Sequence, residues 1–342
     1  MDLAIGIPGE DIGTVNAAGA VQVLYGTVGG LSATSNQLWH QDSTGIEGAA
    51  EADDHFGWAL AAGDFNGDGY GDLAVGIPGE DINTVANAGA VSILYGSAAG
   101  LSATGDQLWH QDSSGIEGAA EANDNFGSAL AAGDFNGDGR ADLAVGVPYE
   151  NVGAVADAGA VNILYGSAAG LSASGDQLWD QESTDIEGAA ETGDNFGWAL
   201  AAGDLNGDGR ADLATGIPNE DISTIANAGA VSILYGSAAG LSASGDQLWH
   251  QDSPGIEGAA ETNDYFGRAL AIAPRVIAPP TPTATQTRTP TATVTRTPTR
   301  TATATQTQTP TRTPTGMPTY TPTATLPAGL KVYLPIVLRN SY

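Results

Sequence analysis

The 342-residue chain contains no cysteine, which excludes disulfide bonds, zinc–thiolate sites and thiol nucleophiles. Basic residues are scarce, because 10 Lys and Arg stand against 40 Asp and Glu for a formal charge of −30. A surface of that charge repels phosphate backbones, so nucleic-acid binding is excluded. No apolar run is long enough to predict a transmembrane span, and no signal peptide is visible at Met1. Without cysteine, a bound metal is the natural candidate for a stabilising cross-link.

The charge is concentrated in the first part of the chain. All 40 acidic residues but only three basic ones lie before Ala273, so residues 1–273 carry −37. Residues 274–327 are a Thr/Pro-rich linker that cannot form a core, and we expect a semi-rigid stalk that carries O-linked sugar outside the cell. A plain disordered tail is the alternative. Residues 328–342 form a short apolar tail, read either as an anchoring segment or as a remnant strand of another domain.

Before this stalk the sequence repeats with a period of 70 residues. Each unit contains four short strand-like runs, FGWALAAGD, DLAVGIP, GAVSILYG and DQLWHQD in the second unit, separated by clusters of Gly, Asp, Asn and Pro. Four short strands per unit predict a β-propeller blade, and the Ala and Gly of the first two runs suit crowded inner strands. The fold class is therefore all-β, with a linear β-solenoid as the alternative. The period is marked by one Phe and one Trp per unit: Phe56, Phe126, Phe196 and Phe266, and Trp39, Trp109, Trp179 and Trp249.

The repeat predicts a propeller domain over residues 1–273. Residues 56–125, 126–195 and 196–265 are whole units, whereas residues 1–55 lack the first strand. Residues 266–273 supply that strand alone, so they are predicted to complete the N-terminal blade and close a ring of about four blades. The alternative is that the chain is a fragment of a larger propeller, since Met1 falls in the middle of a repeat.

One nine-residue pattern stands between the first two strands of each whole unit: DFNGDGYGD at 64–72, DFNGDGRAD at 134–142 and DLNGDGRAD at 204–212. Side-chain oxygens fall at positions 1, 3, 5 and 9, and the carbonyl at position 7 adds another. Calcium prefers six to eight such oxygens. The predicted ligands are Asp64, Asn66, Asp68, Tyr70 and Asp72, then Asp134, Asn136, Asp138, Arg140 and Asp142, then Asp204, Asn206, Asp208, Arg210 and Asp212, with Tyr70, Arg140 and Arg210 acting through the backbone carbonyl.

Three copies of this pattern favour metal binding over an Asx-rich turn that binds nothing. Three carboxylates within nine residues repel one another unless a cation lies between them. Calcium is preferred to magnesium because the ligands are mostly protein oxygens, and zinc would require His or Cys. The loop is not an EF-hand, because position 12 is Val75, Val145 or Thr215 instead of Glu and strands flank the loop. About three Ca²⁺ sites are expected.

The ordered series of Phe-Gly, the DxNxDGxxD loop and the DLAVGIP segment resembles the FG-GAP repeat of the integrin alpha-chain β-propeller and its bacterial relatives. The resemblance covers about residues 2–273. It implies calcium binding by the three loops and a role in adhesion or ligand binding. The first unit departs from the family pattern, because only Asp2 of its loop is present. A seven-bladed ring, as in integrins, would require more blades than this chain encodes.

No residue set indicates an enzyme. His40, His110 and His250 each stand beside an acidic residue in WHQD, but the third unit has Asp180 at this position, and an active site is not repeated in every blade. They are predicted to decorate an outer strand, and His55 to lie in a surface loop. The P-loop, the Gly-x-Ser-x-Gly elbow and the HExxH motif are absent from the sequence.

The sequence therefore predicts a calcium-binding, secreted or cell-surface glycoprotein that acts as an adhesion module. Loops such as Gly79–Gly89 would present polar groups to an unknown protein or carbohydrate ligand. The alternatives are an accessory or catalytic propeller of a secreted polysaccharide-degrading or other hydrolytic enzyme, and a purely structural surface protein.

Overall fold

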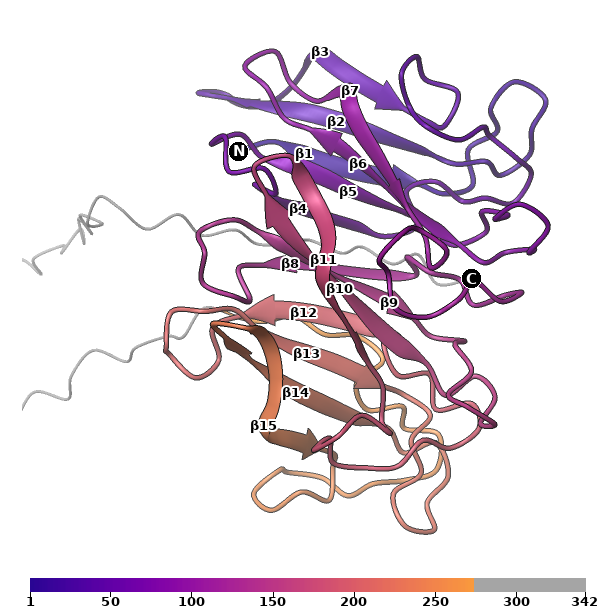
Figure 1. Ribbon diagram of the computed structural model, residues 1–342, viewed down its shortest axis with the longest axis vertical. Coiled ribbons are helices and arrows are strands. Elements are labelled where there is room, and N and C mark those ends of the chain that lie inside the picture. Colours follow the sequence, from indigo (N-terminus) through magenta and orange to yellow (C-terminus); the bar gives the residue numbers. More distant parts are fainter. Residues whose placement is uncertain (274–342) are drawn as a thin grey trace, which may run out of the picture. The chain divides into compact units, whose positions relative to one another are not determined.

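The computed structural model describes residues 1–273, which contain fifteen strands in four antiparallel sheets (Figure 1). Blade 1 has three strands, β1 (Leu3–Ile7), β2 (Ala20–Thr27) and β3 (Gly30–Trp39). Blade 2 comprises β4 (Leu60–Gly63), β5 (Asp72–Ile77), β6 (Ala90–Tyr95) and β7 (Ser102–Trp109). Blade 3 comprises β8 (Ala129–Gly133), β9 (Asp142–Val147), β10 (Ala160–Ser167) and β11 (Gly170–Trp179). Blade 4 comprises β12 (Ala199–Gly203), β13 (Asp212–Ile217), β14 (Ala230–Ser237) and β15 (Gly240–Trp249).

Strands follow one another in chain order within each blade, as expected for propeller blades. The central strands read as continuous apolar runs, and β5, β9 and β13 are buried at every residue. Neighbouring blades lie on both sides of β5 and β9, whereas β13 is followed by the Phe266–Gly267 segment. The inner strands β4, β8 and β12 lie next to one another. Only small residues fit at this approach, where the methyl group of Ala132 lies against Gly63 and that of Ala202 against Gly133.

The outer strands connect neighbouring blades through glutamine side chains. A register shift between Ile93 and Tyr95 turns the Tyr95 hydroxyl toward Gln107 of the same blade. Gln107 then reaches blade 3, donating from Nε2 to the Leu171 carbonyl at 3.0 Å and accepting from the Leu171 N–H at 3.0 Å. Blades 1 and 2, and blades 3 and 4, are joined by the same glutamine bridge.

The Phe-Gly pair of each unit docks on the blade before it. Phe126 is fully buried, and its N–H donates to the Ala88 carbonyl of blade 2 at 2.9 Å. Gly127 has a φ of +91°, and a Cβ at that position would lie 2.6 Å from the Ala90 carbonyl oxygen. Its own carbonyl lies against Gly76 of β5. Phe-Gly and the Gly in DLAVGIP therefore recur together because both are needed for the same contact between blades.

Residues 266–273 differ from the sequence prediction, because they form no strand and blade 1 keeps only three strands. Phe266 instead donates its N–H to the Ala228 carbonyl of blade 4 at 2.9 Å, and Ile272 packs against Gly203 of β12. The physical reason is that the Phe-Gly turn is fixed by the preceding blade. This segment therefore takes up the place that follows blade 4 and does not pair with β1.

The predicted linker at 274–327 and tail at 328–342 lie outside the described residues. Within residues 1–273, no helix is long and apolar enough to cross a membrane.

Candidate metal site in the loops between the first two strands

The three predicted metal loops connect equivalent strands of blades 2, 3 and 4. Residues 64–72 join β4 to β5, residues 134–142 join β8 to β9, and residues 204–212 join β12 to β13. Two glycines in each loop have positive φ, such as Gly67 at +75° and Gly69 at +91°, which lets the chain reverse within a few residues.

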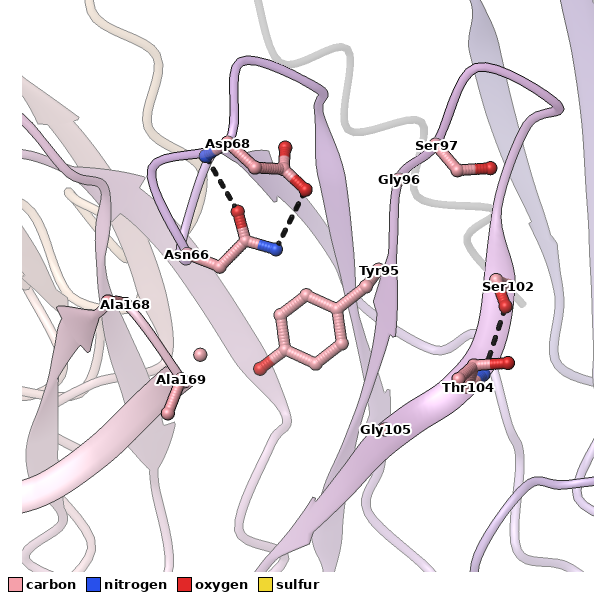
Figure 2. Close-up of a pocket in the computed structure, with 11 residues that line it drawn as sticks. Asn66, Asp68, Tyr95, Gly96, Ser97, Ser102, Thr104, Gly105, Ala168 and Ala169 are labelled. Carbon is pink, nitrogen blue, oxygen red and sulfur yellow. Dashed lines mark hydrogen bonds between the residues drawn. The ribbon is translucent and has the colours of Figure 1, made fainter.

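The side chains at positions 1, 3 and 5 are turned inward by the loop's own N–H groups. Asp64 accepts from the N–H groups of Asp68 at 3.0 Å and Gly69 at 2.9 Å. Asn66 Oδ1 also accepts from the Asp68 N–H, at 2.8 Å, and Asp68 Oδ1 accepts from the Tyr70 N–H at 2.8 Å. Figure 2 shows Asn66 and Asp68 joined by hydrogen bonds beside the ring of Tyr95.

The other two loops repeat this pattern closely. Asp134 accepts from the N–H of Asp138 at 3.0 Å, and Asp204 accepts from the N–H of Asp208 at 3.1 Å. The equivalent asparagines accept from the same donors at 2.8 Å. The sequence pattern therefore produces one local geometry three times.

Position 9 is placed differently, inside the blade. Asp72 is 1% exposed, and its two carboxylate oxygens accept from the N–H groups of Phe65 and Gly96 at 2.8 Å each. Burial is the largest cause of a raised pKa of about 6 at Asp72, and the charge of the nearby Asp68 raises this pKa further. Asp2 makes the same bond to the Gly26 N–H at 2.8 Å. The aspartate at position 9 therefore also has a structural role within the blade.

Position 7 offers a backbone carbonyl, and its side chain points elsewhere. The Arg140 guanidinium lies 3.5 Å from Asp138, and that of Arg210 lies 3.8 Å from Asp208. Both pairs are more than a third exposed, so solvent screens them strongly. Arg140 also lies against Gly67 of the preceding loop, so consecutive loops are in contact.

The residues of the loops fit a hard cation. No group of three or more acidic or His side chains in residues 1–273 is gathered in a metal-binding arrangement, and the carboxylates of the loops accept from backbone N–H groups. The donor set is nevertheless all oxygen, and Asp68 and Asn66 line an open pocket of about 350 Å³ through which an ion can approach. The fifteen ligands stay a prediction.

Backbone bonds connect each loop to the next, a feature that the sequence analysis missed. The Asp64 carbonyl accepts from the Ala141 N–H of the following loop at 3.0 Å, and the Asp134 carbonyl accepts from the Ala211 N–H at 2.9 Å. No side-chain pattern could have indicated these contacts, because only main-chain atoms take part. The first residue of each of these two loops is therefore tied to the neighbouring blade.

Comparison with known families assigns the repeated unit. The FG-GAP repeat model matches residues 56–94, 126–164 and 196–234, which contain the three loops and the strands on either side. The chain carries three FG-GAP repeats. The resemblance proposed from the sequence is confirmed for these units, as is the all-β class.

Relatives of two kinds share the FG-GAP region. A phosphatidylinositol-glycan-specific phospholipase D from Bos taurus is 39% identical over 162 residues, 47% of this chain and 18% of that protein. Integrin alpha-PS2 from Drosophila melanogaster is 34% identical over 174 residues, 49% of this chain and 12% of that protein. Integrin alpha-3 from Cricetulus griseus is 36% identical over 152 residues, 43% of this chain and 12% of that protein. The chain spans less than a fifth of these relatives.

The histidines of the FG-GAP units lie where the outer strands end. The His40 N–H donates to Ser43 Oγ at 3.0 Å, and the Asp180 N–H makes the same bond to Ser183 in blade 3. Either residue type therefore serves the turn. His55 is half-buried, and its Nδ1 lies 3.0 Å from the Pro8 carbonyl oxygen.

A second acidic feature, also missed from the sequence, recurs between consecutive blades. Gln41 donates to Glu80 at 2.5 Å between blades 1 and 2, and Gln111–Glu150 and Gln181–Glu220 repeat this bond at 2.5 and 2.7 Å. Burial, followed by the charge of Asp54, raises the pKa of Glu80 to about 7. The constant spacing of 39 residues between these partners was the available sequence clue.

Proposed function

We propose that each of the three FG-GAP loops binds one Ca²⁺ through the side chains at positions 1, 3, 5 and 9 and the carbonyl at position 7. The observation that carries this proposal is the hydrogen bond from the Asp N–H at position 5 to the Asn side chain at position 3, which recurs in all three loops, whose potential metal ligands are all oxygen atoms. Hard divalent cations of flexible coordination prefer such ligands, which favours calcium over magnesium and zinc.

Bound calcium would act on the fold and not as a signal. Each ion adds two positive charges to a region that carries −37, which relieves repulsion among the carboxylates. Because the first residue of two loops accepts a backbone bond from the next blade, fixing a loop also fixes a junction between blades. Calcium would thus stabilise the contact between blades as well as each loop.

We infer that the calcium-loaded blades form a ligand-binding or adhesion module on the outside of the cell. Extracellular calcium modules bind with dissociation constants of about 0.1–1 mM, which suits loops as open as these. The similarity to integrin alpha chains supports this role. The region would then present the loops at the other end of its blades to a protein or carbohydrate.

A second candidate function is an accessory part of a larger enzyme. The similarity to phosphatidylinositol-glycan-specific phospholipase D favours this alternative. We infer that the FG-GAP region itself is not catalytic, because its His–acid pairs recur from blade to blade and take part in turns.

Calcium removal tests the proposal. At about 2 mM calcium and about 0.1 mM affinity, each loop contributes RT ln(1 + 20), or about 1.8 kcal/mol, and three loops about 5 kcal/mol. We therefore expect calorimetry to show a melting temperature several degrees lower in chelator than in calcium. The triple variant Asp68→Asn, Asp138→Asn and Asp208→Asn should lose most of this difference, because it keeps the turn-forming oxygens but removes three charges.

The matched control replaces His40, His110 and His250 with Ala, and its response to calcium should equal that of the wild type. Identical unfolding transitions in chelator and in millimolar calcium would contradict calcium binding by the loops.

A further inference from the structure

The residue that follows Phe-Gly differs among the repeats, although the turn around it does not. Trp58, Ser128, Trp198 and Arg268 are equivalent positions at the 70-residue period. Each donates its N–H to the carbonyl three residues earlier, at 3.0–3.1 Å. One type of backbone turn therefore presents three different side chains, Trp, Ser and Arg, in the four repeats.

The equivalent positions 58, 128, 198 and 268 form a row, and the small side chain of Ser128 leaves a pocket in it. The pocket has a volume of about 360 Å³ and is lined by Trp58, Ser128 and Trp198, the equivalent residues of three consecutive turns, together with Tyr149. The Trp58 side chain is 49% exposed. Trp198 meets Tyr149 edge to face with ring centroids 6.3 Å apart. The pocket thus combines aromatic walls with a small residue where the neighbouring repeats carry Trp.

The next position in the row shows how a long side chain occupies such a space. The guanidinium of Arg268 lies over Trp198 at 5.5 Å from the ring centroid and over Tyr265 at 5.4 Å. A long residue at position 128 would extend over its neighbours in the same way. Ser128 is therefore the residue that keeps the pocket open.

Neutral hydrogen-bonding groups stand beside the aromatic walls. Asn87 Nδ2 donates to Asn123 Oδ1 at 3.0 Å, which leaves an amide acceptor on Asn87 and an amide donor on Asn123 without a partner among residues 1–273. A hydroxyl group both donates and accepts, so it matches such an amide pair. Asn125 is fixed by bonds from its Nδ2 to the Pro78 and Asn87 carbonyls at 2.8 and 3.1 Å.

The lining residues exclude other ligand classes. No Lys or Arg lines the pocket, and the surrounding charge of −37 over residues 1–273 repels phosphate, sulfate and other anions. Pro78 and Pro148 are its only aliphatic side chains, which gives an acyl chain little to contact.

We propose that this pocket binds a neutral saccharide, whose ring lies on Trp58 while its hydroxyl groups bond to the Asn87–Asn123 pair. A pyranose ring has an apolar C–H face and a hydroxyl-bearing edge, and the pocket offers one surface for each. This inference names the ligand class of the proposed ligand-binding module and therefore rests on that role. It does not depend on calcium in the loops, because no residue of 64–72, 134–142 or 204–212 lines the pocket.

Titration of the full chain with neutral tetrasaccharides tests the inference. Cello-, xylo-, malto- and chito-oligosaccharides are added separately while tryptophan fluorescence is recorded, and at least one should give a saturable change. Trp58→Ala should weaken that binding at least tenfold by removing a stacking surface. Ser128→Arg should weaken it at least as much by filling the pocket.

Ser114→Arg is the matched control, since it introduces the same charge at an exposed serine outside the pocket and should leave the affinity unchanged. All three variants should bind calcium as the wild type does, so failure of the saccharide site is distinguishable from failure of the metal loops. The proposal is overturned if no oligosaccharide binds at 10 mM, if Ser128→Arg binds equally well, or if sulfated oligosaccharides or tetramethylammonium bind in place of the neutral series.

Discussion

Buried glutamates are the residues with the clearest electrostatic cost in this molecule. Glu80 and Glu220 are each 8% exposed and accept a hydrogen bond from a glutamine of the preceding blade. The charges of Asp54, Glu51 and Asp81 face Glu80, and Gln41 opposes them with its hydrogen bond. Burial is the largest cause and raises the pKa of Glu80, Glu150 and Glu220 to about 7 in each case.

These pKa values predict that the protein loses stability as the pH rises from about 4.5 to about 7. In that window the unfolded chain releases protons that the folded chain still holds at these glutamates, so the folded state becomes relatively less stable. The triple variant Glu80→Gln, Glu150→Gln and Glu220→Gln lacks this effect. As the pH rises from 5 to 8, its free energy of unfolding should increase relative to that of the wild type by up to roughly 3 kcal/mol per site.

Denaturant titrations in saturating calcium measure this difference, because the metal loops then contribute equally to both proteins. Glu10→Gln, Glu47→Gln and Glu257→Gln, all at exposed positions, provide a charge-matched control with no expected pH effect. A variant and a wild type whose stabilities change in parallel from pH 5 to pH 8 would rule out buried, protonated glutamates.

The Phe-Gly turn is the element on which the contact between blades depends. Gly127 and Gly175 have similar positive φ values, +91° and +79°, but a Cβ at position 127 would lie 2.6 Å from the Ala90 carbonyl oxygen, whereas position 175 has no atom within 4 Å. Gly127→Ala should therefore cost the left-handed strain of about 1 kcal/mol and roughly 1–3 kcal/mol more for the clash.

Gly175→Ala is the matched control and should cost the strain alone. The free energies of unfolding of the two variants, compared by denaturant titration, isolate the close approach. Equal losses of stability would show that the Phe-Gly turn does not need its tight contact with the preceding blade.

The same turn explains which part of each element could be predicted from the sequence. The run DLAVGIP predicted a strand over 72–78, and β5 spans Asp72–Ile77. FGWALAAGD predicted a strand from Phe56, but β4 begins at Leu60, because the Phe56 N–H bonds to the Ala18 carbonyl of the preceding blade and the Trp58 N–H turns back to the His55 carbonyl. Local alternation of residues predicts a strand, but it carries no information about a contact with a residue 38 positions earlier in the chain. The closing strand at 266–273 was mispredicted for the same reason.

The candidate metal site was predictable to a similar extent. Spacing alone located Asp64, Asn66 and Asp68 on one turn, since alternate residues of a tight loop face inward. The burial of Asp72 and its bond to the Gly96 N–H depend on the third strand of the blade, 24 residues away. The pocket at Ser128 could be anticipated only by comparing equivalent positions of the repeat, because its walls come from three turns spaced 70 residues apart.

At the scale of the whole molecule, the charge of −37 over residues 1–273 opposes folding through self-repulsion. Only two ion pairs occur in this region, Arg140–Asp138 and Arg210–Asp208, so most carboxylates have no basic partner. The screening length falls from about 30 Å at 0.01 M salt to about 3 Å at 1 M. Added NaCl should therefore raise the melting temperature of the calcium-free protein by several degrees.

Calorimetric scans in chelator at 10 mM and 500 mM NaCl measure this rise. Asp68→Asn, Asp138→Asn and Asp208→Asn remove three of the crowded charges, so the triple variant should show a smaller increase than the wild type. Saturating calcium should reduce the increase further, because three bound ions would change the net charge of this region from −37 to −31. A melting temperature that stays constant or falls with NaCl would mean that repulsion among carboxylates does not limit stability. The stabilisation by calcium would then come from loop geometry alone, since neutralising the charge would contribute nothing.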